Sequence, residues 1–188
     1  MPELVICYGS NHRAELKKGR MKRLTLIGMP GSGKSAVGRI IATRLGWEFI
    51  DTDLCIERRF GRKLQAVVDQ VGAEEFGRIE EETVLGLVGE RPAVISTGGS
   101  VVYSEAAMRH LASISTVVFL DVPLPRLHGH IAQQAPRGIV GMGDGGLEEL
   151  YQKRFELYHR YAHSIVLLHG ENLEEAATRI MSQCDIST

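Results

Sequence analysis

The sequence has few cysteines, no long apolar run and no excess of charge of either sign. Cys7, Cys55 and Cys184 are far apart and show no C-x-x-C spacing, which argues against a disulfide framework or a zinc site and fits a reducing compartment. No apolar segment approaches the roughly 20 residues of a membrane-spanning helix. The formal net charge of −1 gives no global electrostatic reason to bind nucleic acid or an anionic membrane. We therefore expect a cytoplasmic protein without nucleic-acid or membrane partners, in which any anion binding is local.

Strand and helix patterns alternate along the chain. Apolar segments that predict strands are 23–28, 47–51, 92–97, 115–122 and 163–170. Helical patterns lie at 34–46, 53–60, 63–90, 105–112 and 172–184. Strands that are apolar throughout are buried on both faces, so the sheet should be parallel and covered by helices. The sequence predicts one α/β domain over 21–188, a three-layer α/β/α arrangement around a five-stranded parallel sheet, with 1–20 as an N-terminal extension of no assigned role.

One segment breaks this alternation. Residues 133–148 contain five glycines and one proline and show no clear periodicity. Such a composition is typical of a surface loop that closes over a site. We therefore expect a lid here.

The segment "GMPGSGKS", Gly28 to Ser35, satisfies G-x-x-x-x-G-K-[ST] between a predicted strand and a predicted helix. Glycines let successive N–H groups point inward, and the helix N-terminus adds positive potential, so the loop should bind phosphates. Lys34 is expected to reach the β- and γ-phosphates, and Ser35 to offer its hydroxyl to Mg²⁺. Ala36 removes one hydroxyl that many such loops direct to a phosphate. The alternative is a glycine turn with no ligand. The predicted nucleotide-binding residues are Gly31, Ser32, Gly33, Lys34, Ser35 and Ala36.

Two carboxylates, Asp51 and Asp53, end the second predicted strand. In an open parallel sheet, ligands bind beyond the carboxyl ends of the strands, so both should face the crevice of the phosphate loop. Phosphoryl transfer needs a metal near the phosphates and a group that orients the attacking hydroxyl. We assign Asp51 to the metal side and Asp53 to the acceptor hydroxyl. The alternative is that one or both cap the following helix.

An ordered set of segments now indicates a family. The stretch "GMPGSGKSAVGRIIATRLGWEFIDTDLCIERRFGRK", followed by "EFGRIEEE", "STGGS" and "KRFELYHRYA", resembles the shikimate kinases over about 23–184. The resemblance implies a helical substrate-binding insert at about 53–82 and a lid at about 133–148. It implies transfer of the γ-phosphate of Mg·ATP to the 3-hydroxyl of shikimate or a related polyhydroxylated acid. We expect this small-molecule acceptor as the partner of a monomeric enzyme.

The resemblance also implies roles for individual residues. Lys34 and Asp53 fall on catalytic positions, and Arg137 falls on the lid arginine that reaches the transferred phosphate. Arg154 falls on an arginine that pairs with the acceptor carboxylate, because a planar guanidinium offers paired donors to carboxylate oxygens. The metal falls to Ser35 and Asp51. The glycines of "STGGS", Gly98 and Gly99, would offer backbone N–H groups to the acceptor, beside Ser100.

Departures from the family pattern lie on the acceptor side. Gly77 stands where the family has a second carboxylate-binding arginine, and Ser100 replaces a third glycine. Arg78 is next to Gly77, but one step along a helix turns a side chain by about 100°. If shikimate is nevertheless the acceptor, Arg78 or Arg62 should supply the missing charge. The glutamates of "EEFGRIEEE" are expected to form a solvated helix face with intrahelical ion pairs.

Other readings stay open at this point. A phosphate-loop kinase for gluconate or a nucleotide is one, although "DTD" together with "STGG" argues against gluconate. A catalytically weak ATP-binding protein of the same fold is another, although the intact Lys34, Ser35, Asp51 and Asp53 argue against it.

Overall fold

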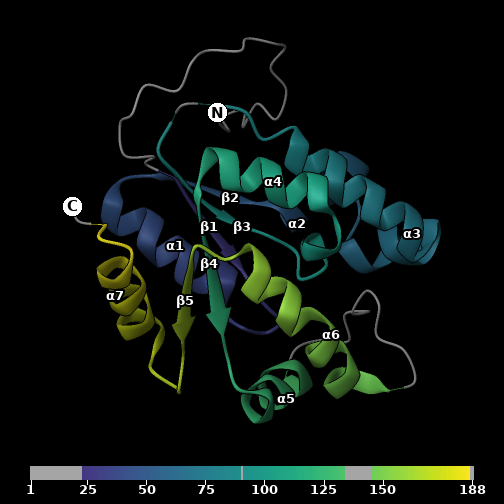
Figure 1. The fold of residues 1–188 in the computed structure, drawn as a ribbon. Helices are drawn as coiled ribbons and strands as arrows, with labels where there is room; N and C mark the ends of the chain where they lie inside the picture. The colour runs from purple at the N-terminus through teal and green to yellow at the C-terminus, as the bar shows by residue number, and fades with distance from the viewer. Residues whose placement is uncertain (1–22, 90, 134–144, 187–188) are drawn as a thin grey trace.

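A computed structural model describes residues 23–89, 91–133 and 145–186 (Figure 1). The predicted extension 1–20 lies outside these residues, as do Arg137 and most of the predicted lid. No helix in the described ranges is long and apolar enough to cross a membrane.

A five-stranded parallel sheet forms the centre of the fold. Its strands are β1 Arg23–Ile27, β2 Glu48–Asp51, β3 Ala93–Ser96, β4 Thr116–Asp121 and β5 Ser164–Leu167, in the order β2-β3-β1-β4-β5. The predicted sheet is confirmed, with strand ends shorter than the sequence pattern by one to three residues. Because β1 pairs with both β3 and β4, the loop that follows β1 emerges at the middle of the sheet edge.

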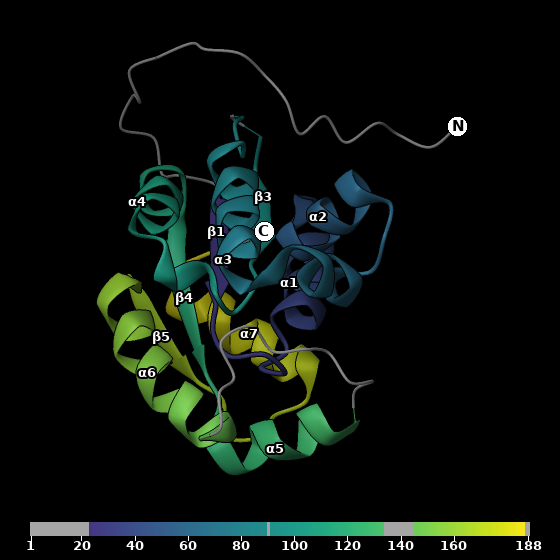
Figure 2. The ribbon, with the colours of Figure 1, turned by 90° about the vertical axis from the view of Figure 1, so that its right-hand side faces the viewer.

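Helices cover both faces of this sheet, which confirms the three layers. They are α1 Lys34–Leu45, α4 Glu105–Ile114, α5 Leu124–Gln133, α6 Gly146–Tyr161 and α7 Leu173–Gln183. In Figure 2, α1 lies on one side of the sheet, where it packs with α7, and α4 and α6 lie on the other. The layers meet in one apolar core, whose fully buried members include Leu24, Leu26, Ile27, Ile95, Val118 and Leu120.

Two helices after β2 form an insert with a small core of its own. They are α2 Thr52–Phe60 and α3 Leu64–Leu85, and they bury Ile56, Val67, Phe76 and Ile79 between them. The prediction of one helix over 63–90 is wrong in two respects. Gly72 interrupts α3 with φ 81° and ψ 167°, a left-handed backbone that glycine tolerates, and the helix ends at Leu85. The insert thus begins directly at the carboxyl end of β2, where the predicted site residues Asp51 and Asp53 lie.

Candidate active site

The phosphate loop joins the end of β1 to the start of α1. Gly28 has φ 147°, and a Cβ there would lie 2.8 Å from the carbonyl oxygen of Leu120 on β4. Gly33, with φ 87°, is the N-cap of α1. Glycine tolerates both backbone conformations, and at Gly28 it also leaves room for Leu120, so geometry as well as ligand chemistry requires glycine at these positions.

Lys34 is folded back onto this loop and is 7% exposed. Its Nζ donates to the carbonyl oxygens of Gly28 and Met29, both at 2.9 Å, and lies 3.4 Å from Ser32 Oγ. Burial lowers the pKa of Lys34 to about 8, while the Asp53 carboxylate opposes that shift. Phosphate oxygens in the loop would therefore both charge this amine fully and bind it.

Ser35 and Asp51 offer the hard oxygen ligands that Mg²⁺ prefers. Ser35 Oγ lies 3.1 Å from Ser96 Oγ at the end of β3. Asp51 Oδ1 accepts from the amides of Asp53 and Leu54 at 3.1 and 3.3 Å, so Asp51 also caps α2, as the alternative reading held. The described residues contain no group of three or more His, Cys, Asp or Glu side chains that could hold a metal. Mg²⁺ in phosphoryl-transfer sites is commonly held by one or two protein groups together with substrate phosphates and water.

Arg154 enters the site from α6 and is 1% exposed. Its Nε donates to Tyr103 Oη at 3.3 Å, and its guanidinium carbon lies 5.2 Å from the centre of the Tyr103 ring. A Cβ at Gly99 would lie 3.0 Å from Arg154 Nη1 and from Pro30 Cδ, while Tyr158 Oη donates to the Gly99 carbonyl at 2.8 Å. Gly99 therefore brings the arginine of α6 against the phosphate loop.

Glu80 contradicts the expectation of a solvated glutamate face, because it is only 2% exposed. A Cβ at Gly98 would overlap Glu80 Oε1 and would lie 2.9 Å from Asp53 Oδ1. Burial raises the pKa of Glu80 to about 7, a hydrogen bond from Ser100 opposes this, and Asp53 adds to it. The sequence carries one signal of this burial. Phe76 and Val84 lie four residues before and after Glu80, on the same face of the helix, and both are buried.

Two residues predicted to bind the acceptor have partners within the protein. The amide of Gly98 donates to Thr52 Oγ1 at 3.3 Å, so its predicted contact with an acceptor would replace or share this hydrogen bond. Arg78 points outward and pairs with Glu74 at 2.7 Å and Glu75 at 3.1 Å.

The structure therefore does not bring Arg78 or Arg62, the two arginines expected to compensate for Gly77, to Arg154 and Glu80. Like Arg78, Arg62 is exposed, and its Nη1 donates to Gln70 Oε1 at 2.8 Å. A Cβ added at Gly77 would meet no described atom within 4 Å.

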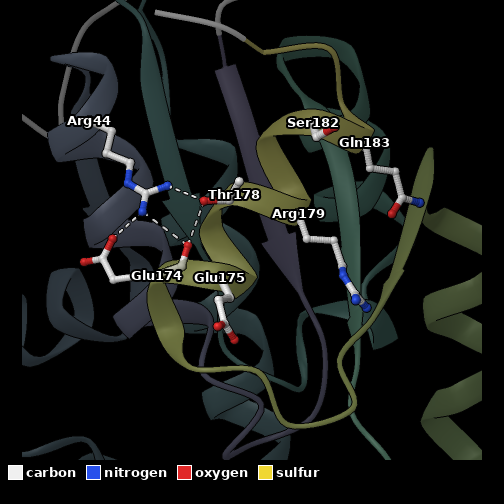
Figure 3. A pocket seen from close by; sticks show the side chains of 7 residues that line it. All are labelled: Arg44, Glu174, Glu175, Thr178, Arg179, Ser182 and Gln183. Atoms are coloured by element: carbon white, nitrogen blue, oxygen red, sulfur yellow. Dashed lines mark hydrogen bonds and ion pairs between the residues drawn. The ribbon is translucent and has the colours of Figure 1, made fainter.

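A separate depression lies between α1 and α7 (Figure 3). Its lining is entirely charged or polar: Arg44, Glu174, Glu175, Thr178, Arg179, Ser182 and Gln183. Arg44 pairs with Glu174 and donates to Thr178 Oγ1 at 2.8 Å. None of the predicted site residues lines it, so we assign it no part in the chemistry.

A buried lysine in a glycine-rich loop, carboxylates at the next strand end and a facing arginine together define a P-loop kinase for a small acidic molecule.

Comparison with known proteins narrows this class. The family model for shikimate kinase matches residues 30–185. A shikimate kinase from Paracidovorax citrulli is 35% identical over 175 residues, covering 90% of this chain and 96% of the relative. One from Clostridium botulinum (strain Eklund 17B) is 34% identical over 158 residues, covering 84% and 94%. The solved shikimate kinase from Acinetobacter baumannii in complex with shikimate superposes with a TM-score of 0.79 at 26% identity, over 85% of this chain and 90% of that one. The chain belongs to the shikimate kinase family and is a kinase.

Proposed function

We propose that the protein transfers the γ-phosphate of ATP to the 3-hydroxyl of shikimate. The observation that carries the proposal is the buried Arg154, held against Gly99 and the phosphate loop, with Asp53 close by. A buried guanidinium beside a phosphate site suits an acceptor that is itself an anion.

The nucleotide half of the reaction belongs to the phosphate loop. Backbone amides from Gly31 to Ala36 would surround the phosphates, and Lys34 would exchange its carbonyl partners for phosphate oxygens. Ser35 and Asp51 would hold Mg²⁺, which neutralises charge on the phosphates when bound. These groups position the γ-phosphate and stabilise the charge that it carries during transfer.

The acceptor half belongs to Asp53 and Arg154. Arg154 would bind the carboxylate of shikimate, which fixes the ring, and Asp53 would accept the proton of the attacking hydroxyl. Gly99 lets Arg154 lie close to the loop, because a side chain there would press on Arg154 and Pro30. Arg137, outside the described residues, stays a predicted contact to the transferred phosphate.

Leu173 supports a place for the nucleobase. It is 46% exposed, and a Cβ at Gly33 would lie 3.8 Å from its Cδ2, so the start of α7 adjoins the phosphate loop. The Arg126 guanidinium lies against Gly170, just before this helix. We place the adenine of ATP on the apolar surface of Leu173, near Arg126.

A related polyhydroxylated acid is the second candidate acceptor. The observation that favours it is Gly77, which leaves open the space that a second cationic side chain would fill.

We further propose that the enzyme is a cytoplasmic monomer. Sedimentation of the purified protein is the direct test of its oligomeric state.

Two substitutions test the proposed roles in a coupled assay of ADP release. Lys34→Met should lower kcat by at least about 100-fold, because it removes a charge that acts on the transferring phosphate. Asp53→Asn should lower kcat by a similar factor of about 100 and leave the KM for ATP near the wild-type value. Wild-type kcat in either variant would contradict the roles assigned.

A further inference from the structure

Glu80 is a buried carboxylate that the mechanism above does not use. In the part of the chain that the structure describes, its Oε1 is buried and has no hydrogen-bond partner. That oxygen faces Gly98, whereas Arg154 Nη1 faces Gly99, the next residue. Arg154 is close enough for its charge to act on Glu80, so an anion bound to Arg154 comes close to Glu80.

The charges around Glu80 come from every element that faces it. Asp53 of α2 repels its negative charge, whereas Arg154 of α6 and Lys34 of α1 attract it, and Ser100 after β3 hydrogen-bonds to it. In the ternary complex Lys34 is committed to phosphate oxygens. Arg154 would then oppose the charge of Glu80, to which Asp53 and the bound acceptor each add a nearby carboxylate.

We propose that Glu80 takes up a proton when the acceptor binds, and thereby sets the charge that the acceptor pocket accepts. This inference rests on the proposed function. The proton comes from solvent: the Glu80 carboxylate becomes a carboxylic acid, and no bond of the acceptor is formed or broken. Once neutral, Glu80 no longer competes with the acceptor carboxylate for the positive charge of Arg154, and its new O–H group can donate a hydrogen bond.

The reason is the cost of placing like charges together. Two carboxylates that share a site cannot both remain ionised without a large penalty, so one of them binds a proton. Glu80 is the group disposed to do so, because its pKa already lies at about 7 before a third carboxylate arrives. A free acceptor carboxylate in water has a pKa far below that value.

Calorimetric titration of shikimate into the protein–Mg·ADP complex counts the proton. Titrations at about pH 8 in buffers of different ionisation enthalpy give the number taken up, and Mg·ADP keeps Lys34 charged throughout. We expect uptake approaching one proton at about pH 8, where Glu80 starts mostly ionised, and falling toward zero at about pH 6. The Kd for shikimate should rise up to about tenfold per pH unit above 7.

Matched variants assign the proton to its residue. Glu80→Gln should abolish the uptake and flatten the dependence of Kd on pH. Glu82→Gln, which removes an exposed carboxylate paired with Arg59 on the same helix, should leave both unchanged. Ser100→Ala removes the hydrogen bond that favours ionised Glu80, so the pH of half-maximal uptake should move upward.

The outcomes separate this inference from the proposed function. Shikimate binding and turnover without proton uptake at about pH 8 would overturn the inference alone, as would undiminished uptake in Glu80→Gln. If Glu80→Gln does not fold, the wild-type proton count and the Ser100→Ala shift decide the matter. Absence of both binding and turnover with shikimate would overturn the inference and the proposed function together.

Discussion

Alanine at Gly98 should damage acceptor binding while alanine at Gly77 should not, although both changes add one methyl group. At Gly98 the new Cβ would overlap Glu80 Oε1 and lie 2.9 Å from Asp53 Oδ1. Glu80 is 2% exposed and cannot retreat into solvent, so the backbone after β3 or helix α3 must shift. At Gly77 the methyl meets no described atom within 4 Å.

The size of each effect follows from these surroundings. Overpacking a buried site costs about 1–3 kcal/mol. If that cost is expressed in acceptor binding, the KM for shikimate should rise by about 5- to 150-fold. Gly77→Ala lies inside helix α3, where alanine is favoured over glycine by about 1 kcal/mol, so its Tm should rise by roughly 2–4 °C.

Steady-state kinetics with each substrate varied in turn, together with thermal melts, measure both effects. The KM for ATP should stay near wild type in both variants, because neither glycine touches the phosphate loop. The reasoning is refuted if Gly98→Ala binds shikimate as wild type does, or if its defect is in the KM for ATP.

Three further predictions follow from the same contacts. Arg154→Lys should raise the KM for shikimate by about 10- to 100-fold, since a lysine cannot supply the paired donors of a guanidinium, and an unchanged KM would place the carboxylate elsewhere. Burial raises the pKa of Glu80, so this side chain favours the folded state below about pH 4.5, and the contribution is lost as the pH rises toward 7. Glu80→Gln should therefore gain up to roughly 3 kcal/mol in free energy of unfolding relative to wild type across this window, which thermal melts at both ends would measure. Leu173→Ala should raise the KM for ATP by about 3- to 5-fold and leave that for shikimate alone, whereas equal shifts in both would remove Leu173 from the nucleobase site.

The parts of the site that sequence could predict are those set by local chain geometry. The phosphate loop is one continuous motif, and Asp51 and Asp53 follow a strand directly, so their placement needs little more than the order of elements. The strands were found because their segments are apolar throughout. Arg154 came from the family resemblance, and the structure brings it to Gly99.

The burial of Glu80 and the contact between Gly98 and Thr52 could not be predicted, because segments distant in the sequence create both. Glu80 sits in a glutamate-rich stretch whose composition indicates a solvated face, and its burial depends on Gly98, Ser100 and Arg154. The amide of Gly98 is engaged by Thr52, 46 residues earlier in the chain. Only the four-residue spacing of Glu80 from Phe76 and from Val84 gave a local indication of its burial.

Helix α5 was missed for a different reason. Its segment, Leu124–Gln133, contains a proline, a glycine and two histidines, which weaken any helical pattern. Pro125 is tolerated because it lies in the first turn, where the backbone N–H has no partner within the helix.

The most direct test of the proposed function is the identity of the phosphorylated product. Purified protein, Mg·ATP and shikimate should release ADP only when shikimate is present, at a kcat of about 1–10³ s⁻¹, and phosphorus NMR should find the new ester on the 3-hydroxyl. ADP release that does not depend on shikimate, or a much higher kcat/KM with another polyhydroxylated acid, would contradict the proposal.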